Sequence, residues 1–450
     1  MSQSGLDRNR VFPIFALVFV DVLGLTIILP LLHLYAAAYG ASPFEIGLVA
    51  AAFPLAQLVG VPMMGALSDR FGRKPLLLIS QITTFISFIM LGLANTLLLV
   101  VLSRVVDGLF GANLATAQAA LSDITTEEDR TRALGLTGAA FGIGFIFGPI
   151  ISLVALQFTD DLAIPAYIAA IYSFISILLT LFVFKETLPP EKRGQPSADA
   201  DPGVSPAVVL RVFALPGIGV LLVLMFAQQV IFFGFESLLG LFTLTRLGLL
   251  GQGNALIFLL VGVILVFVQV RLIGPWSKKY GERKVVAIAL ILISAGMILT
   301  ALTPAQPHPL YVRAAAQNDL VEQSEGSTEA IIGDIRVSLP EESNRGIGGV
   351  AWLVIAVVPL SIGAGLIRPS LNSLMTKRSN STQYGSVLGV SQSFVSAANA
   401  ISPLLGGLLF QQVGATAPFL IGGLIMGGLA VVSLLAIAPQ ESQREAAPSA

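Results

Sequence analysis

Hydrophobic residues in this chain gather into long runs that alternate with short polar connections. Each of the longest runs holds about 20 mostly apolar residues, the length that an α-helix needs to cross roughly 30 Å of hydrocarbon. Lipid offers no hydrogen-bond partner to the backbone, so such runs are expected to be helical. Twelve spans are predicted, at residues 11–34, 45–67, 75–95, 97–119, 131–156, 162–184, 215–244, 254–273, 285–302, 349–374, 386–410 and 415–437.

The composition indicates the same class of protein. Hydrophobic residues make up 55% of the 450 residues and charged residues only 11%, whereas soluble domains are about one quarter charged. The net charge is −1 and no basic stripe is present, so the sequence gives no reason to expect binding to nucleic acid. The chain has no cysteine, and its two histidines are His33 and His308. We therefore expect a multi-pass membrane protein that is not an enzyme and holds no metal or other cofactor.

The positive charges predict the orientation of the chain. Lysine and arginine cluster in alternate connections that share a side with the N-terminus, and the positive-inside rule makes that side cytoplasmic. The first run resembles a signal peptide, but Asp21 and Pro30 lie within it and eleven further spans follow. Both termini are therefore expected in the cytoplasm.

Two similar loops indicate that the chain contains a repeat. Gly65 and Gly72 lie between the second and third spans, and Gly274 and Gly281 lie 209 positions further along, between the eighth and ninth. A second pair of motifs, at residues 148–149 and 402–403, is 45 positions further apart than the loops are. These 45 extra positions match the length of the long polar connection at about residues 303–348. We therefore predict an N-terminal six-helix bundle (1–184), a flexible cytoplasmic linker (185–210) and a C-terminal six-helix bundle (211–450) with an insertion at about 303–348.

The insertion is acidic and is expected on the outer side of the membrane. Its alternating segment at residues 332–339 is compatible with a small strand, but the composition equally favours a mobile acidic loop.

Five charged residues are the clear cases of charge inside the predicted spans. Burying an ionisable group at the centre of a bilayer costs about 2.5–3.5 kcal/mol, so each is expected to have a role. We predict that Asp21 carries a proton, that Arg104 and Asp107 tune it, and that Glu236 is a second proton site. The alternatives are that Asp21 is a structural carboxylate, that Arg104 and Asp107 form a fixed ion pair, and that Glu236 lies at a water-exposed rim. Arg368 lies near the cytoplasmic end of its span, where snorkelling favours a structural role.

The spans also contain candidate substrate and packing residues. The candidate substrate cavity comprises Gln228, Gln229, Phe232 and Arg368. Glycine and proline permit close helix contact and local bending. Such positions are Gly144, Gly148 and Pro149 in the fifth span, and Pro403, Gly406 and Gly407 in the eleventh.

These motifs together resemble the major facilitator superfamily, across the chain except for the insertion. Residues 65–74 look like the family's motif A, 104–111 like motif B and 144–149 like motif C, which is associated with antiporters. Asp21, Asp123 and Arg130 resemble positions of drug:proton antiporters of the tetracycline-exporter type. Ser152 and Leu153 replace the last glycines of motif C, and spans three and nine lack the acidic residues of tetracycline exporters, so tetracycline itself is in doubt as the substrate.

The resemblance implies a latch at the cytoplasmic side. In motif A, Asp69 is expected to face the N-terminus of the eleventh span, where the helix dipole favours an anion. The gate residues are Gly65, Asp69, Arg70, Gly72, Arg73 and Lys74, and those of the repeated loop are Gly274, Lys278, Lys279, Gly281 and Arg283. Because Lys278 stands where the first loop has Asp69, the second latch is expected to be weaker.

The favoured hypothesis is an all-α transporter with twelve transmembrane helices in two pseudo-symmetric bundles. It would export small lipophilic compounds in exchange for protons, as a monomer in a prokaryotic inner membrane. Its partners would be the substrate, protons and the lipid bilayer. A metabolite or sugar symporter or uniporter is the rival within transport. A membrane sensor that uses the acidic insertion is the rival from another class.

Overall fold

The computed structural model describes residues 8–125, 127–159, 161–193, 206–322, 336–379 and 384–437, and these are almost entirely helical. The α-helices are α1 (Arg8–Ile28), α2 (Leu32–Ala38), α3 (Pro43–Phe71), α4 (Arg73–Gly92), α5 (Leu97–Phe110), α6 (Asn113–Ile124), α7 (Glu127–Phe158), α8 (Ala163–Phe182), α9 (Pro206–Phe213), α10 (Ile218–Leu247), α11 (Gly251–Phe267), α12 (Ile273–Tyr280), α13 (Glu282–Ala301), α14 (Arg313–Glu322), α15 (Gly348–Lys377), α16 (Tyr384–Gln412) and α17 (Ala417–Ala436). Short segments of other helix types are η1 (Pro190–Lys192), η2 (Val268–Leu272) and η3 (Glu342–Asn344).

The helices confirm the predicted spans. Within the described residues, eleven helical stretches are long and apolar enough to cross a membrane. The remaining predicted span, 131–156, lies in α7, of which Gly142–Phe158 is an apolar stretch within the described residues. The prediction of a twelve-helix, all-α membrane fold is therefore confirmed.

Two predicted spans are each broken into two helices. The first span is interrupted between α1 and α2 around Pro30, which has no backbone N–H to continue the ladder. The fourth is interrupted between α5 and α6, where the Ser80 hydroxyl accepts a 2.8 Å hydrogen bond from the Ala112 amide and donates one to the Phe110 carbonyl. Ser80 thus satisfies backbone groups that the break exposes, and the break lets α6 begin inside the bundle.

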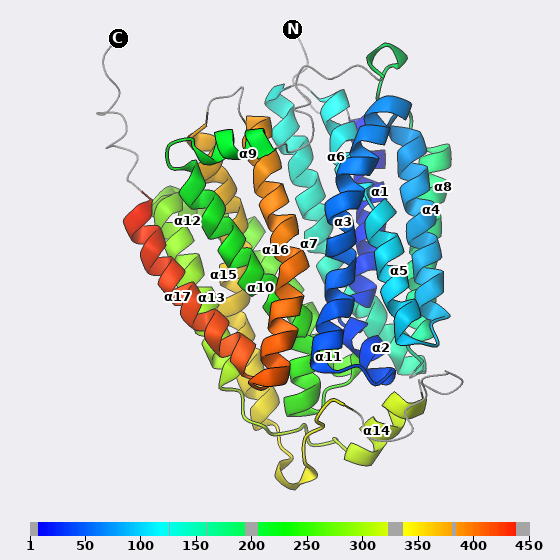
Figure 1. The fold of residues 1–450 in the computed structure, drawn as a ribbon, viewed down its shortest axis with the longest axis vertical. Coiled ribbons are helices and arrows are strands. Elements are labelled where there is room, and N and C mark those ends of the chain that lie inside the picture. The colour runs from blue at the N-terminus through cyan, green and yellow to red at the C-terminus, as the bar shows by residue number, and fades with distance from the viewer. Residues whose placement is uncertain are drawn as a thin grey trace.

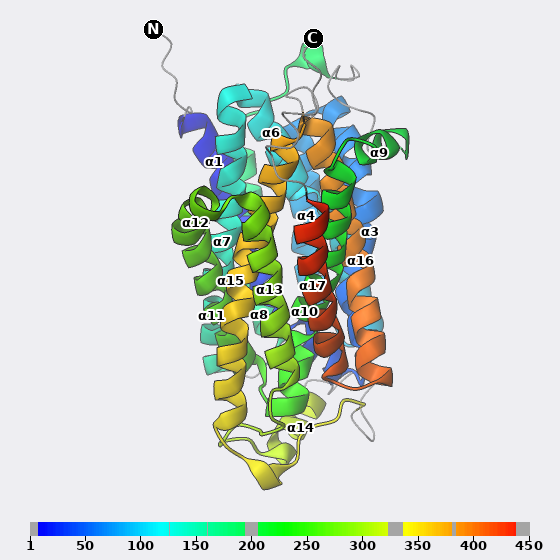
Figure 2. The same ribbon diagram turned by 90° about the vertical axis from the view of Figure 1, so that its left-hand side faces the viewer.

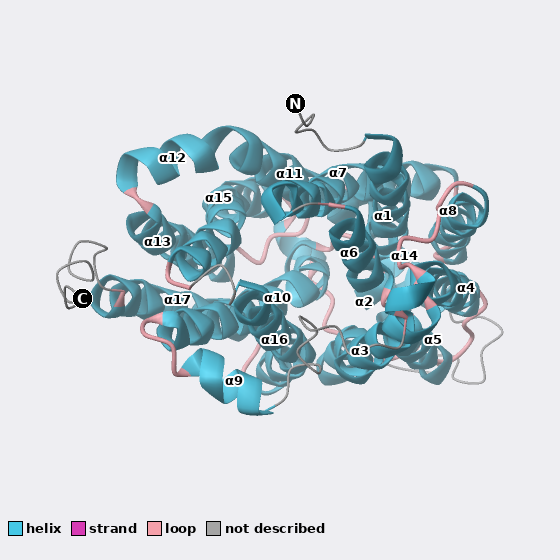
Figure 3. Cartoon of the chain, turned by 90° about the horizontal axis from the view of Figure 1, so that it is seen from above, coloured by secondary structure: helices cyan, strands magenta, loops and turns pink. Residues whose placement is uncertain are grey.

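The two halves of the chain form neighbouring groups of helices. Figure 3 shows α1–α8 on one side and most of α9–α17 on the other, with α7 beside α11. Helix α1 begins and α17 ends at one end of the molecule, here called the terminal end, and α14 lies at the opposite, insertion end (Figure 1). The repeated loops share a backbone conformation, since Gly72 and Gly281 have φ of 106° and 74° and follow α3 and α12. This similarity supports the pseudo-symmetry.

The halves contact each other along α7 and α11 as far as the middle of these helices, and at the insertion end α3 and α16 meet as well. There the first turns of α3 pack against α16 so closely that a Cβ on Gly47 would lie 2.4 Å from the Pro403 carbonyl oxygen. The Phe44 amide donates to Gln411 Oε1 at 3.1 Å, and Asn254 Nδ2 donates to the Pro30 carbonyl at 3.0 Å. Towards the terminal end α3 and α16 diverge (Figure 1). The halves are therefore joined at the insertion end in this conformation.

The insertion packs against the helices, in contrast to the loose acidic loop suggested by its composition. The His308 amide donates to the Leu247 carbonyl at 3.0 Å, and Tyr311 is only 2% exposed. Helix α14 buries Ala316 and Leu320, contacts α2, and lies below the first half of the chain (Figures 1 and 2). Apolar residues among the acidic ones therefore hold the insertion in place.

Part of the insertion lies outside the described residues. Of the segment 332–339, the structure describes residues from 336 on, and these form bends and irregular chain instead of a strand.

The start of the linker is also held in place. The Glu186 carboxylate accepts hydrogen bonds from the Arg73 and Lys74 amides, at 2.9 and 3.1 Å, and so caps the N-terminus of α4. Lys74 Nζ in turn donates to the carbonyls of Leu181 and Phe184. Residues 185–193 are thus attached to the motif A loop, while 194–205 lie outside the described residues.

Candidate transport site and gate loops

Asp21 lies in the middle of α1 and binds a neutral amide. Asn113 Nδ2 donates to Asp21 Oδ1 at 2.7 Å and also lies 3.5 Å from Thr84 Oγ1. Asn113 is the first residue of α6, so the helix break positions its side chain towards α1. Asp21 has no ion-pair partner among the described residues. A carboxyl group bound in this way can gain or lose a proton without breaking an ion pair.

The second pair of predicted residues forms the ion pair that the sequence suggested. Arg104 Nη1 lies 3.4 Å from Asp107 Oδ2, and both side chains are buried. The guanidinium also donates to Ser87 Oγ at 3.0 Å and lies over the Phe88 ring, 5.5 Å from its centroid. Asp107 is close enough to Asp21 for the two carboxyl groups to repel each other. The pair is therefore an electrostatic neighbour of Asp21.

Glu236 lies apart from this cluster, on α10. No hydrogen bond or ion pair of its side chain occurs among the described residues, and the side chain is partly accessible. One helical turn closer to the insertion end, Gly240 packs against His33 and Asn254. Glu236 therefore lies just inside the place where the two halves meet.

His33 and Asn254 form part of that junction, and the sequence analysis did not assign them a role. Asn254 Nδ2 lies 3.3 Å from His33 Nε2 as well as bonding to Pro30, and Asn254 Oδ1 accepts from Thr243 Oγ1 at 2.8 Å. All of these side chains are buried. They join α2, α10 and α11 and help to close the insertion end.

The second half supplies a separate polar wall. Gln229 Nε2 donates to Asn399 Oδ1 at 2.8 Å, and Arg368 Nη2 donates to Gln392 Oε1 at 2.9 Å. Gln228, also predicted to line the cavity, is only 2% exposed and bonds to the Met225 carbonyl of its own helix. Phe232 stacks on Phe235 at a centroid distance of 6.2 Å.

The motif A loop is a network of charged side chains. Arg73 Nη1 lies 2.6 Å from Asp69 Oδ1, and Arg73 Nε lies 2.9 Å from Asp123 Oδ2. Thr187 of the linker donates to the same Asp123 carboxylate at 3.1 Å. Arg70 lies over the Phe71 ring, 5.3 Å from its centroid. Arg73 therefore connects α3, α4 and α6.

Parts of the expected latch are not described. The side chains of Arg130 and Ser386 lie outside the described residues. Asp69 pairs with Arg73 in a conformation whose halves are joined at the other end, so its contact with α16 stays a prediction.

The repeated loop uses different partners. Glu282 pairs with Lys377 and accepts from Ser373 Oγ at 3.2 Å, while Arg283 donates to the Leu434 carbonyl. Lys279 lies over the Tyr280 ring, 5.1 Å from its centroid. An added Cβ on Gly274 or Gly281 would meet no atom of the described chain within 4 Å. The second loop thus binds α15 and α17 and has open space around its glycines.

The motif C glycines allow α7 to approach α1. A Cβ on Gly148 would lie 2.2 Å from Thr26 Oγ1, and one on Gly144 would lie 2.5 Å from Val22 Cγ1. Ser152 donates to the Ile27 carbonyl at 2.5 Å. This serine, which departs from the motif, therefore contributes a hydrogen bond to the same helix contact.

Gly406 and Gly407 of α16 also lie at contacts. A Cβ on Gly406 would lie 2.6 Å from Leu238 Cδ1, and one on Gly407 would lie 2.7 Å from the Pro43 carbonyl oxygen. Both candidate glycine motifs therefore lie at close helix contacts.

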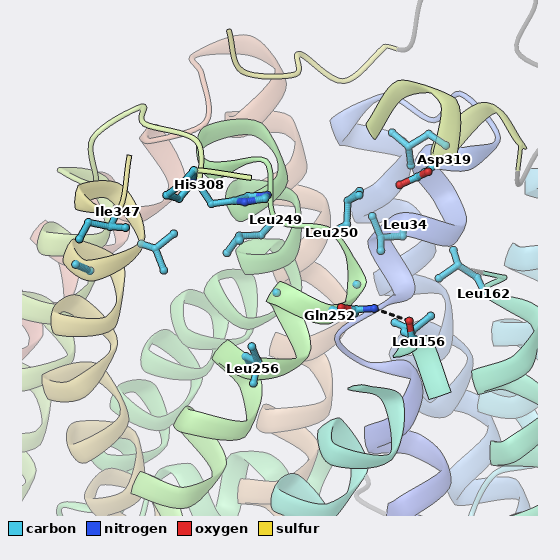
Figure 4. Close-up of a pocket in the computed structure, with 16 residues that line it drawn as sticks. Leu34, Leu156, Leu162, Leu249, Leu250, Gln252, Leu256, His308, Asp319 and Ile347 are labelled. Carbon is cyan, nitrogen blue, oxygen red and sulfur yellow. Dashed lines mark hydrogen bonds between the residues drawn. The ribbon is translucent and has the colours of Figure 1, made fainter. Parts of the chain in front are cut away.

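A cavity of about 660 Å³ lies beneath the insertion (Figure 4). Leucine is the commonest residue in its walls, and His308 and Asp319 lie at its edges. Gln252 bonds to the Leu156 carbonyl at its floor, across the two halves. The cavity therefore lies over the closed junction.

Comparison with known proteins assigns the family. A model of the Major Facilitator Superfamily matches residues 14–316 and 345–450. The chain belongs to the Major Facilitator Superfamily. Between the two matched ranges the match omits residues 317–344, which fall within the insertion.

Curated relatives in this superfamily are bacterial resistance proteins. The chain is 28% identical to the tetracycline resistance protein, class B, of Escherichia coli over 87% of this chain and 86% of that protein. It is 24% identical to multidrug resistance protein 2 of Bacillus subtilis over 95% of both chains. The resemblance that the motifs predicted is therefore confirmed.

Solved structures share the superfamily fold. The human organic anion transporter MFSD10 (TETRAN) superposes with a TM-score of 0.65 at 21% identity, covering 97% of this chain and 100% of that chain. The nucleoside transporter NupG superposes with a TM-score of 0.68 at 15% identity, covering 95% of this chain and 98% of that chain. At these identities the comparison supports the fold alone. Within the described residues, no group of three His, Cys, Asp or Glu side chains is arranged to hold a metal ion.

Proposed function

We propose that this chain is a proton-coupled secondary transporter that exports small lipophilic compounds by alternating access. The observation that carries the proposal is Asp21, a carboxyl group in the middle of a membrane span that bonds to Asn113 and interacts electrostatically with Asp107 of the Arg104–Asp107 pair. The curated relatives named as tetracycline and multidrug resistance proteins support export as the direction. Moving one proton inward releases about 2.3 kcal/mol per 100 mV of membrane potential.

The arrangement of the helices supports alternating access. The halves are joined at the insertion end and diverge at the terminal end. In the proposal, residues 1–184 and 211–450 are the two moving bundles, 185–210 links them, and the terminal end faces the cytoplasm of a prokaryotic cell. The protein acts as a monomer. The described conformation then opens towards the cytoplasm, ready to receive substrate and to release a proton from Asp21.

The first test measures proton release in proteoliposomes that contain a trapped pH dye. Lipophilic drugs are added one at a time to the wild type, to Asp21→Asn and to the control Asp161→Asn, whose carboxylate lies in an exposed connection at the insertion end. We expect drug-triggered proton movement in the wild type and the control, and at least a tenfold slower response in Asp21→Asn.

Two results would count against the proposal. A folded wild type that moves no proton with any drug would favour metabolite transport or sensing. An Asp21→Asn variant with the wild-type response would remove Asp21 as the proton carrier.

A further inference from the structure

Arg368 is a positive charge within a membrane span that has no acidic partner. Its Nη2 donates to the neutral Gln392 side chain, and no ion pair of Arg368 occurs among the described residues. A guanidinium group has five N–H donors in a planar fork suited to carboxylate and phosphate groups. Most of these donors are free of described protein acceptors. The side chain is therefore available to bind an anion.

Arg368 is exposed, but it lies on a face of α15 whose neighbouring turns are buried. Ser361 and Met375 lie seven residues before and after it, on the same face of α15, and both are 0% exposed. Arg368 and Gln392 are nevertheless accessible to solvent. Together these facts indicate that the pair borders an internal space and not the surrounding lipid.

Snorkelling to the membrane surface does not explain this arginine. Nine residues separate it from Lys377 at the end of α15, which is about 13 Å along the helix axis. The predicted span ends sooner, at residue 374, about 9 Å along the axis, but a side chain in a helix leans towards the helix N-terminus and so away from that end. The hydrogen bond to Gln392 instead holds the guanidinium sideways, towards α16.

The neighbouring surface of α16 suits an amphiphilic molecule. Asn399 lies two turns beyond Gln392 on the same face and binds Gln229 of α10. Phe394 meets Phe226 of α10 edge to face, with ring centroids 6.0 Å apart. Polar amides and aromatic rings therefore lie on adjacent parts of α10 and α16.

The acidic candidates lie deeper than Arg368. Asp21 is 13 residues from the start of α1 at the terminal end, and Glu236 is 18 residues from the start of α10. At 1.5 Å per residue these depths are about 20 and 27 Å, compared with about 13 Å for Arg368. A compound entering from the terminal end meets the positive charge first.

We propose that Arg368, positioned by Gln392, binds an anionic group of the transported compound. The substrates are then small lipophilic organic acids, carboxylates or sulfonates, whose apolar part packs against the aromatic side chains of α10 and α16. This inference rests on the proposed function, because it names the substrate class of the same transport site.

The test uses two fluorescent probes with one skeleton. 8-Anilinonaphthalene-1-sulfonate carries an anionic group that N-phenyl-1-naphthylamine lacks, and ethidium serves as a cationic probe. Flux of each is measured in energised proteoliposomes with the trapped pH dye, for wild type, Arg368→Gln, Arg368→Lys and Gln392→Leu. Surface Arg211→Gln is the matched control.

We expect the wild type to transport the sulfonate at least tenfold faster than the neutral probe. Arg368→Gln should lower the ratio of sulfonate flux to neutral-probe flux at least tenfold, because the positive charge that binds the sulfonate is gone. Arg368→Lys should retain part of the preference because the charge remains, and Gln392→Leu should weaken it.

The possible failures are distinguishable. Proton-coupled flux of the cationic or neutral probes without flux of the sulfonate would overturn the inference and leave the proposed function intact. An equal loss of all probes in Arg368→Gln, together with an unchanged preference in folded Gln392→Leu, would show a structural arginine and also overturn it. Absence of proton-coupled flux for every probe would overturn both proposals.

Discussion

At the scale of single residues, Asn113 has the most informative environment. Its Nδ2 donates to Asp21, while its Oδ1 is buried without a partner among the described residues. An amide offers donors on one side and an acceptor on the other. It can therefore bind an ionised Asp21 through Nδ2 or, after turning over, a protonated Asp21 through Oδ1. This makes Asn113 a positioning residue for both protonation states.

Replacing Asn113 by leucine should slow proton-coupled transport about tenfold or more. A hydrogen bond to a charged group contributes about 1.5–3 kcal/mol, and 1.4 kcal/mol is a factor of ten. The measurement is the initial rate of drug-triggered pH change, repeated across external pH to detect a displaced profile. Asn95→Leu, in an exposed connection, is the control. Wild-type rates and an unchanged pH profile in Asn113→Leu would rule out this role.

At the scale of elements, the motif A loop connects three helices and the linker. Gly72 has a φ of 106°, which residues with a Cβ rarely adopt, and Glu186 caps the helix that follows it. Arg73 then brings Asp69 and Asp123 together. The loop is thus rigidly attached to the first half, which is what a latch on the second half requires.

The substitution Asp69→Asn should slow transport two- to fivefold and leave the protein folded. The expected loss is the interaction between a carboxylate and the N-terminus of α16 in the opposite conformation, which contributes about 0.3–1 kcal/mol. Flux and thermal unfolding are measured side by side. Lys278→Asn, at the corresponding position of the repeated loop, should have a smaller effect. Full transport rates in Asp69→Asn would reject the latch.

At the scale of the whole molecule, the insertion bridges the two halves at the end where they meet. Helix α14 contacts α2, and Arg336 Nη1 lies 3.4 Å from Glu45 Oε2 at the start of α3. Both side chains of this ion pair are exposed, so the pair itself contributes at most about 1 kcal/mol. The ion pair shows that the insertion and the start of α3 are in contact here, and these two surfaces must separate if the insertion end opens.

A cross-link between these surfaces should stop transport. The chain has no cysteine, so the double variant Glu45→Cys/Arg336→Cys can be joined selectively with a short bismaleimide. Each single variant, treated in the same way, should keep its flux. Undiminished transport by the cross-linked double variant would mean that the insertion end opens without separating the insertion from α3, or not at all.

Several features of this protein follow from local sequence. The apolar runs predict the spans because each crossing needs about 20 residues whatever its neighbours are. Asp21, Arg104 and Asp107 are conspicuous because a charge in lipid is costly. The repeated glycines at 72 and 281 predict matching loops because a positive φ favours glycine.

Other features depend on contacts between residues far apart in the chain. Nothing local distinguishes Asn113 from other amides, yet it bonds to a carboxylate 92 positions away. The same holds for Glu186 at the N-terminus of α4 and for Asn254 beside His33. The insertion has an acidic composition, but its few apolar residues are buried against the helices. The sequence alone determined which segments enter the membrane and which charges need a role, because the free energy of placing a residue in lipid depends mainly on that residue and its own segment. Only the tertiary structure decided the partners of those charges, because helix packing selects among many equally polar side chains.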